Sequence, residues 1–242
     1  MNFSLEITMK TDLSTLPKVK DVYITMLPGD SFKSVAEKAK DLVQSGFNPV
    51  PHFPARSIKN LFELKEYVGM CKKNGVKQAL VIGGSTQPIG DFHCSLQLLE
   101  TGLFEGFKIG IAGHPDGSPD ISDSDLEKAM KDKKPYADYI VTQWLLDSSM
   151  IADFISKQTL PVHVGITGPL KISSLLKFAS IVGAKNSLNF LKSNATKAVD
   201  LIKPRDPNNL IEKLKGSTKN FHIYTFGGLK ETNKWLTENN YA

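Results

Sequence analysis

The feature that most constrains the fold is a regular alternation of short apolar runs and longer amphipathic segments. The runs that have the composition of buried strands are 3–9, 21–27, 49–53, 78–84, 107–113, 138–144, 161–166 and 221–227. Apolar residues recur at helical spacing between them, and the segments 31–46 and 60–75 end in glycine, as helix C-termini prefer. This number of helix-separated strands, in a chain of roughly 250 residues, is typical of a (β/α)8 barrel.

We therefore predict an α/β fold with a single domain, a (β/α)8 TIM barrel over residues 1–242. A doubly wound open sheet is the alternative, but it normally has fewer strands, and no GxGxxG motif follows the first run. The segment 11–20 is short for a full helix, so we expect the first helix to be missing or reduced. Other helices are predicted at 122–134, 147–158, 173–183 and 229–239, with two more within 184–220.

Composition excludes several other classes of protein. The net charge is +5, but the lysines are spread along the chain without a basic cluster, so we expect no nucleic-acid partner. No apolar run approaches the ~18 residues of a membrane span and no signal sequence begins the chain, so we expect a cytoplasmic protein with no membrane partner. Cys71 and Cys94 lie in helix-like segments and are expected to be buried free thiols. The five histidines show no metal-binding spacing, so no metal site is predicted.

Polar residues and glycines gather where the predicted strands end. In a barrel the active site lies at the carboxyl ends of the strands. These positions are occupied by Glu6, Thr25, His52, Gly83, Gly84, Ser85, His114, Thr142, Gln143, Gly165, Tyr224 and Thr225. The sequence thus predicts one shared site there, with the two adjacent glycines letting a ligand approach the backbone.

Each of these residues also has a structural explanation. Glu6 lies in an apolar strand, where it either pairs with a lysine or, with a raised pKa, acts as a proton donor. His52 and His114 could be structural histidines, Gln143 a core amide, and the glycine pair a simple turn. The direction of His163 within its strand stays open.

Short segments at successive strand ends resemble the methylenetetrahydrofolate reductase family. They are SLEI (4–7), PHFPAR (51–56), LVIGGS (80–85), GIAGHPDGSPD (110–120), YIVTQWLLD (139–147), VGITGPL (164–170) and FHIYTFGGLKET (221–232). The resemblance runs over nearly the whole chain, and its most specific pieces are AGHPDG, the TQ pair that follows it and the acid of the first strand. It implies a folate-linked oxidoreductase that reduces 5,10-methylenetetrahydrofolate to 5-methyltetrahydrofolate with NADH or NADPH through FAD.

The resemblance also implies roles for individual residues. Glu6 matches the general acid, and Gln143 and Tyr224 are expected to bind substrate. The expected cofactor-binding positions are Thr25, His52, Gly83, Gly84, Ser85, His114, Lys128 and Lys131. The partner is then a folate, and the protein could be a homo-oligomer.

Two strand ends depart from the family. Gly83, Gly84 and Ser85 stand where the family commonly has an Arg-Gly-Asp-like sequence, and Phe226-Gly227-Gly228 replaces an end such as Asn-Arg. Each lost charged contact is worth roughly 1.5–3 kcal/mol when buried. These losses favour two alternatives: a flavin-independent folate enzyme of methyl transfer or demethylation, and a non-catalytic folate-binding protein.

Overall fold

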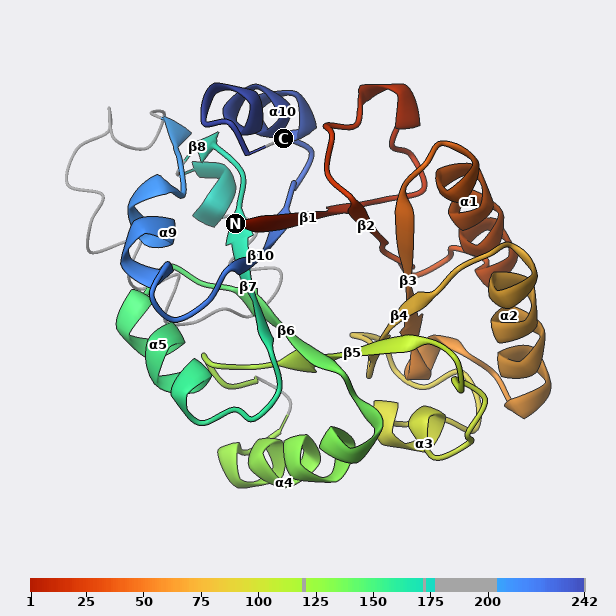
Figure 1. Cartoon of the computed structure of the whole chain (residues 1–242). Helices are drawn as coiled ribbons and strands as arrows, with labels where there is room; N and C mark the ends of the chain where they lie inside the picture. The colour runs from red at the N-terminus through yellow and green to blue at the C-terminus, as the bar shows by residue number, and fades with distance from the viewer. Residues whose placement is uncertain (119–120, 172, 177–203, 242) are drawn as a thin grey trace.

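The structure is a computed structural model, and it describes residues 1–118, 121–171, 173–176 and 204–241. Parallel strands close into a barrel in the order β1-β10-β7-β6-β5-β4-β3-β2. Their bounds are β1 Asn2–Ile7, β2 Asp21–Ile24, β3 Asn48–Pro54, β4 Gln78–Ile82, β5 Lys108–Gly113, β6 Tyr139–Trp144, β7 Val162–Thr167 and β10 Asn220–Tyr224. The predicted TIM barrel is confirmed, and Figure 1 shows the helices outside the ring of strands.

Helices follow most of the strands and cover the outside of the barrel. They are α1 Phe32–Gln44, α2 Leu61–Lys73, α3 Ser95–Leu99, α4 Asp123–Lys133, α5 Ser148–Ser156, α9 Asn208–Leu214 and α10 Leu229–Glu238. Side chains of Ser31, Asn60 and Asp147 accept hydrogen bonds from the first free N–H groups of α1, α2 and α5, which explains where these helices begin. Residues 173–176, at the start of the predicted helix 173–183, are helical, and α9 is one of the helices expected within 184–220. Residues 177–203 lie outside the described part of the chain.

The first helical unit is reduced, as predicted. Only a 3-10 turn, Leu13–Thr15, separates β1 from β2. The outer face of β1 is covered instead from the C-terminal end of the chain. The Phe3 ring lies 5.8 Å from that of Trp235 in α10 and 4.6 Å from that of Tyr241, centroid to centroid. The last helix and the residues after it therefore supply the apolar cover that a first helix would give.

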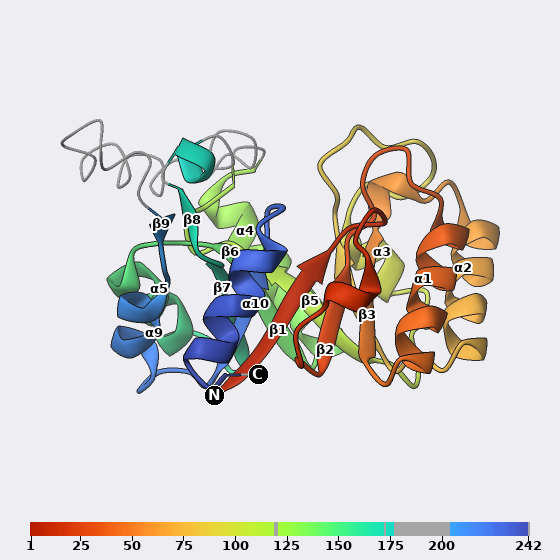
Figure 2. The same cartoon turned by 90° about the horizontal axis from the view of Figure 1, so that it is seen from above.

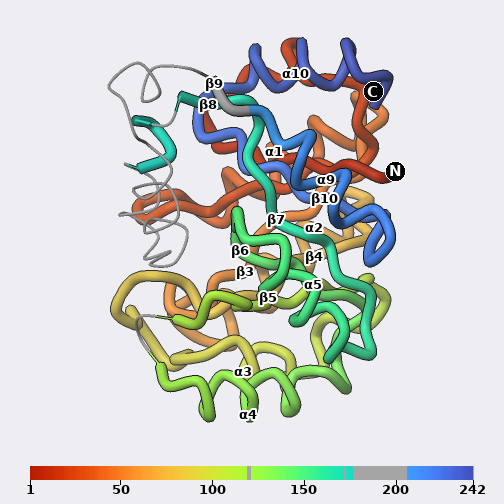
Figure 3. The backbone as a smooth tube through the Cα atoms, turned by 90° about the vertical axis from the view of Figure 1, so that its left-hand side faces the viewer, coloured from red at the N-terminus to blue at the C-terminus, as the bar shows by residue number. Residues whose placement is uncertain are grey.

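Three details add to or differ from the sequence predictions. A short antiparallel pair, β8 Leu170–Lys171 and β9 Pro204–Arg205, follows β7 beside the barrel. The helix after β4, α3, spans only five residues and lies beside α4 (Figure 3). Cys71 is buried in α2 as expected, but Cys94 is exposed because it precedes α3 in an extended conformation.

The barrel interior has a polar lower end and an apolar middle. At the amino ends of the strands, near the chain termini in Figure 2, Asp21 Oδ1 accepts hydrogen bonds from Asn48 Nδ2 at 3.1 Å and Gln78 Nε2 at 3.0 Å. Above them a cluster of buried side chains fills the barrel: Tyr23, Val50, Leu80, Tyr139 and Val141. The space that remains for chemistry is therefore at the carboxyl ends. No helix in the described part of the chain is long and apolar enough to cross a membrane.

Candidate active site

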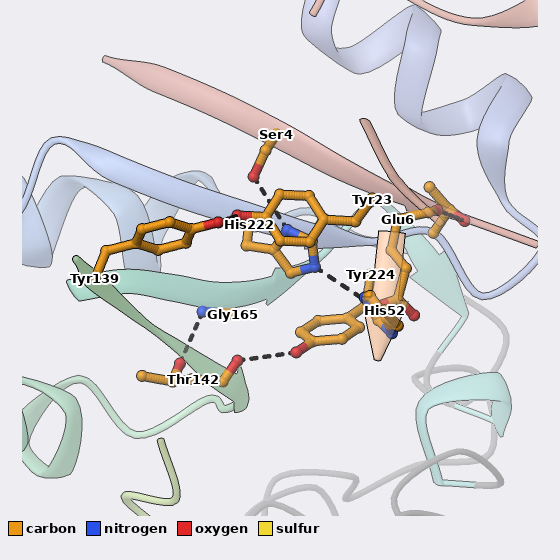
Figure 4. A network of polar contacts seen from close by, with 10 residues as sticks. Ser4, Glu6, Tyr23, His52, Tyr139, Thr142, Gly165, His222 and Tyr224 are labelled. Carbon is orange, nitrogen blue, oxygen red and sulfur yellow. Dashed lines mark hydrogen bonds and ion pairs between the residues drawn. The ribbon is translucent and has the colours of Figure 1, made fainter. Parts of the chain in front are cut away.

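Glu6 and two histidines form the centre of the polar cluster at the carboxyl ends of the strands (Figure 4). Glu6 lies near the end of β1, His52 on β3 and His222 on β10. One carboxylate oxygen, Glu6 Oε2, is 3.6 Å from His52 Nε2 and 3.6 Å from His222 Nε2. Both imidazoles are buried, whereas 20% of the Glu6 side chain is exposed. The carboxylate is thus the part of this cluster that a molecule from outside can reach.

The surroundings of Glu6 keep its carboxyl group ionised. Burial alone raises the pKa of Glu6, but the imidazoles of His222 and His52 and the Thr25 hydroxyl together bring that pKa below its usual value. The expectation of a raised pKa and a proton donor is therefore wrong. It considered only the apolar strand around Glu6, whereas polar groups from three other strands approach its carboxylate. At neutral pH Glu6 is a proton acceptor.

Three buried polar atoms around Glu6 have no hydrogen-bond partner among the residues that the structure describes. They are Thr25 Oγ1, His52 Nε2 and His222 Nε2. Burial lowers the pKa of His52 to about 4, so its imidazole is neutral at neutral pH. Buried polar groups normally have partners, and unsatisfied ones that gather in one place are typical of sites that hold a ligand or water. The cluster is therefore incomplete without a polar molecule.

A second group of polar residues joins this cluster through Tyr224. Tyr224 is the register partner of Glu6, and its hydroxyl donates to Thr142 O at 2.9 Å. The next residue, Gln143, has its Oε1 atom 3.1 Å from His114 Nδ1. The structure thus brings six of the predicted site residues to one rim: Glu6, Thr25, His52, His114, Gln143 and Tyr224.

The glycine pair after β4 has a structural reason within the chain. Gly84 adopts a φ of +89°, in the left-handed region that favours glycine. A Cβ atom on Gly84 would lie 3.2 Å from Pro54 Cβ, and Arg56 N donates to Gly83 O at 3.0 Å. Ser85 is exposed. The end of β3 therefore accounts for the close approach to this backbone, and no cofactor is needed to explain it.

Lys128 and Lys131 lie away from the mouth of the barrel. Both are exposed on α4, and Lys128 Nζ forms an ion pair with Asp132 one turn later. Helix α4 packs on the outside of the strands, so neither ammonium group belongs to the cluster around Glu6.

The sequence reading missed His222, together with its neighbour Ser4. His222 is fully buried, and its Nδ1 lies 3.0 Å from Ser4 Oγ. The signal was available, because residues two apart on a strand share a face and Tyr224 was already assigned to the site. His163 also points inward, and its ring stacks on that of Tyr139 at 4.6 Å between centroids.

The residues at the mouth do not suit a divalent cation. Among the described residues no group of three or more His, Cys, Asp or Glu side chains is arranged to hold a metal ion. Hard cations such as Mg²⁺ prefer a shell of oxygen ligands, whereas Glu6 supplies a single carboxylate flanked by two imidazoles. We therefore derive no chemistry that passes through a metal.

Comparison with known proteins gives a match of fold. No protein-family model matches the chain. An oxaloacetate acetylhydrolase bound to the inhibitor 3,3-difluorooxalacetate aligns over 98% of this chain and 79% of its own, with 10% identity and a TM-score of 0.58. A 2,3-dimethylmalate lyase, a member of the PEP mutase/isocitrate lyase superfamily, aligns over 99% of this chain and 82% of its own, with 8% identity and a TM-score of 0.57.

These matches overturn the family prediction. The solved structures that the chain resembles are a hydrolase and a lyase of the PEP mutase/isocitrate lyase group and not methylenetetrahydrofolate reductases. Assignment to that reductase family, reduction of a folate by NADH or NADPH, and FAD as cofactor are therefore wrong. The two folate-linked alternatives depended on the same resemblance and are corrected with it.

The error has a physical origin. The segments that carried the resemblance are short strand ends, and any barrel of this type gathers polar residues and glycines there. One of the supposed cofactor contacts, Gly84, is accounted for by its left-handed backbone and its close approach to Pro54. At 8–10% identity the structural matches establish a shared (β/α)8 fold, and function must be argued from the site itself.

Proposed function

We propose that this chain is an enzyme of the lyase or mutase type, which moves a proton on a small oxo- or hydroxy-carboxylic acid. The observation that carries the proposal is the ionised, partly exposed carboxylate of Glu6, surrounded by buried polar atoms that have no partner in the described part of the chain. A general base must combine a basic group with access to its substrate, and Glu6 has both.

The reaction assigned to the site is removal of a proton by the Glu6 carboxylate. In an oxo acid this proton leaves a carbon next to the carbonyl group, and negative charge develops on the carbonyl oxygen. In a hydroxy acid it leaves the hydroxyl group, the C–O bond becomes a carbonyl as the neighbouring carbon–carbon bond breaks, and the electron pair of that bond stays on the departing carbon, which takes the proton back from the Glu6 carboxyl group. Thr25 Oγ1 and His52 Nε2 are the unpartnered groups next to Glu6 that can hydrogen-bond to the substrate oxygen.

Two observations support an acid as the substrate. The proteins that share the fold act, by their names, on oxaloacetate and on 2,3-dimethylmalate, which are an oxo acid and a hydroxy acid. The rim also has a free donor, because Gln143 uses its Oε1 atom with His114 and its amide NH₂ group has no partner among the described residues. An amide NH₂ group can bind a carboxylate without adding charge to the site.

The experiment tests the reaction class before the identity of the substrate is known. Purified protein is incubated in D₂O with a panel of 2-oxo and 2-hydroxy mono- and dicarboxylic acids, and each mixture is followed by ¹H NMR. We expect at least one acid to be cleaved or to exchange a C–H proton for deuterium. Glu6→Gln should slow that reaction by about 10²–10⁴-fold, the usual contribution of a positioned general base.

Lys128→Ala is the matched control, because it removes a charged side chain far from the mouth. It should leave the rate unchanged. The proposal is contradicted if the folded protein acts on no acid in the panel, or if Glu6→Gln reacts as fast as the unsubstituted protein.

A further inference from the structure

His222 is enclosed at the base of the Glu6 site. Its imidazole is fully buried, with the Tyr23 ring 4.3 Å and the Tyr224 ring 4.8 Å away, centroid to centroid. Nδ1 lies 3.0 Å from Ser4 Oγ, and Nε2 lies 3.6 Å from Glu6 Oε2 (Figure 4). The two ring nitrogens therefore face two different groups, and the aromatic rings beside them hold the imidazole in place.

The serine proton decides which nitrogen of His222 carries hydrogen. Ser4 is buried, and its hydroxyl has one proton to donate. The only partner of Ser4 Oγ among the described residues is His222 Nδ1. If Nδ1–H donated to the serine instead, the buried hydroxyl proton would have no acceptor, which is a costly arrangement. Ser4 therefore donates, Nδ1 accepts, and the hydrogen of the ring is on Nε2.

We propose that Ser4 is a positioning residue, which fixes His222 in the Nε2–H form so that its N–H points at Glu6 Oε2. This inference rests on the proposed function of Glu6 as a base. Nε2–H faces Oε2 at 3.6 Å, so its dipole stabilises the negative charge of the carboxylate without a hydrogen bond and leaves Oε1 for the substrate. Ser4 thus acts on the reaction through His222, without touching the substrate.

Other titratable groups lie around His222. They are Tyr224 on the same strand, Glu6 on the paired strand β1, Tyr23 on β2, His52 on β3 and His163 on β7. Burial keeps both tyrosines neutral by raising their pKa values, and it lowers the pKa of His52 and of His163 to about 4. None of these groups supplies a positive charge at neutral pH that could replace the Nε2–H contact.

The direct test is ¹⁵N NMR of the histidine rings, assigned with a His222→Gln variant. In the unsubstituted protein at pH 7 we expect the long-range ¹H–¹⁵N correlations of His222 to show the Nε2–H tautomer. Ser4→Ala should produce a mixture of both tautomers, and Ser4→Thr, which keeps the hydroxyl, should restore the single form. A wild-type ring protonated at Nδ1 would overturn the proposal without any variant having to fold.

Activity gives an independent measurement. On an acid that the enzyme turns over, Ser4→Ala should lower kcat about tenfold with little change in KM, and it should move the acid limb of the pH–rate profile to higher pH. The control is Ser156→Ala, which removes an exposed serine that donates only to a carbonyl in its own helix and should change neither.

The two proposals fail in different ways. An Nε2–H tautomer that depends on Ser4, in a protein without turnover, would refute the proposed function but not the hydrogen-bond arrangement. Turnover that depends on Glu6, with an unchanged tautomer in Ser4→Ala, would refute the role of Ser4 alone.

Discussion

The polar groups at the two ends of the barrel interior differ in how completely they are hydrogen-bonded. At the amino ends of the strands, Asp21 Oδ1 receives hydrogen bonds from both Asn48 and Gln78. At the carboxyl ends, Glu6 lies 3.6 Å from two imidazole nitrogens, and neither nitrogen has a hydrogen-bond partner within the described ranges of the chain. Polar groups that satisfy one another contribute to stability, whereas unsatisfied ones near solvent are available to a ligand. We therefore assign a role in stability to the amino ends of the strands and a role in ligand binding to their carboxyl ends.

The largest expected contrast is between substitutions of the two acids. Asp21→Ala leaves two part-buried amides without their acceptor, so it should lower the free energy of unfolding by about 1 kcal/mol. Glu6→Gln should abolish most of the activity, with little loss of stability, because the amide keeps an oxygen and removes a buried charge. Urea unfolding and turnover, measured on both variants, check this. The comparison breaks down if Glu6→Gln is the less stable of the two.

The next effect is loss of stability in acid. The pKa of His52 and that of His163 are lowered to about 4 in the folded protein from 6.5. Since the unfolded chain binds these protons first, stability is fully present above pH 6.5 and falls as the pH drops towards 4. For His52 the loss amounts to about 3 kcal/mol at the low end of this range.

Thermal unfolding between pH 7 and pH 4 measures this acid effect. His52→Gln and His163→Gln should each reduce the dependence of the melting temperature on pH. Only His52→Gln should also lower activity, because His163 lies away from Glu6. A pH dependence that neither substitution changes would contradict the assignment.

A smaller effect is expected at the glycine pair. Gly84→Ala forces a side chain into the left-handed region and towards Pro54, which should cost roughly 1–2 kcal/mol. Gly83→Ala is the control, because a Cβ atom there meets nothing within 4 Å. Melting temperatures should therefore separate the two variants. Equal stability, with loss of activity in both, would instead indicate that a ligand uses this backbone.

The smallest effect is expected on the outer surface. Lys128 is exposed, and its ion pair with Asp132 joins two residues on the same helix face. Lys128→Ala should leave both the melting temperature and the turnover rate unchanged within error. A clear loss of activity in this variant would show that the site extends to α4.

Much of the fold could be predicted from the sequence, because short segments of the chain specify the strands and helices. Apolar runs separated by amphipathic segments specify strands and helices, and their number specifies a closed barrel. Even the missing first helix follows from the short segment 11–20. Three statements remain predictions: that the protein has no nucleic-acid or membrane partner, that it is cytoplasmic, and that it could form a homo-oligomer. The prediction that Cys94 is buried was wrong, because the apolar periodicity that indicates burial inside a helix does not extend to the residue before its start.

The candidate site was only partly predictable. The sequence by itself determined which polar residues lie at strand ends. In a barrel these ends form one rim, so the sequence placed Glu6, His52, Gln143 and Tyr224 together there. The strand pattern could place His222 on the same face as Tyr224, but only the tertiary structure shows its Nε2 atom 3.6 Å from Glu6 Oε2, because β1 and β10 become neighbours only when the barrel closes. The tertiary structure also decided the direction of the Glu6 pKa shift. Burial raises the pKa of Glu6, but the groups that lower it lie on β3, on β10 and directly after β2.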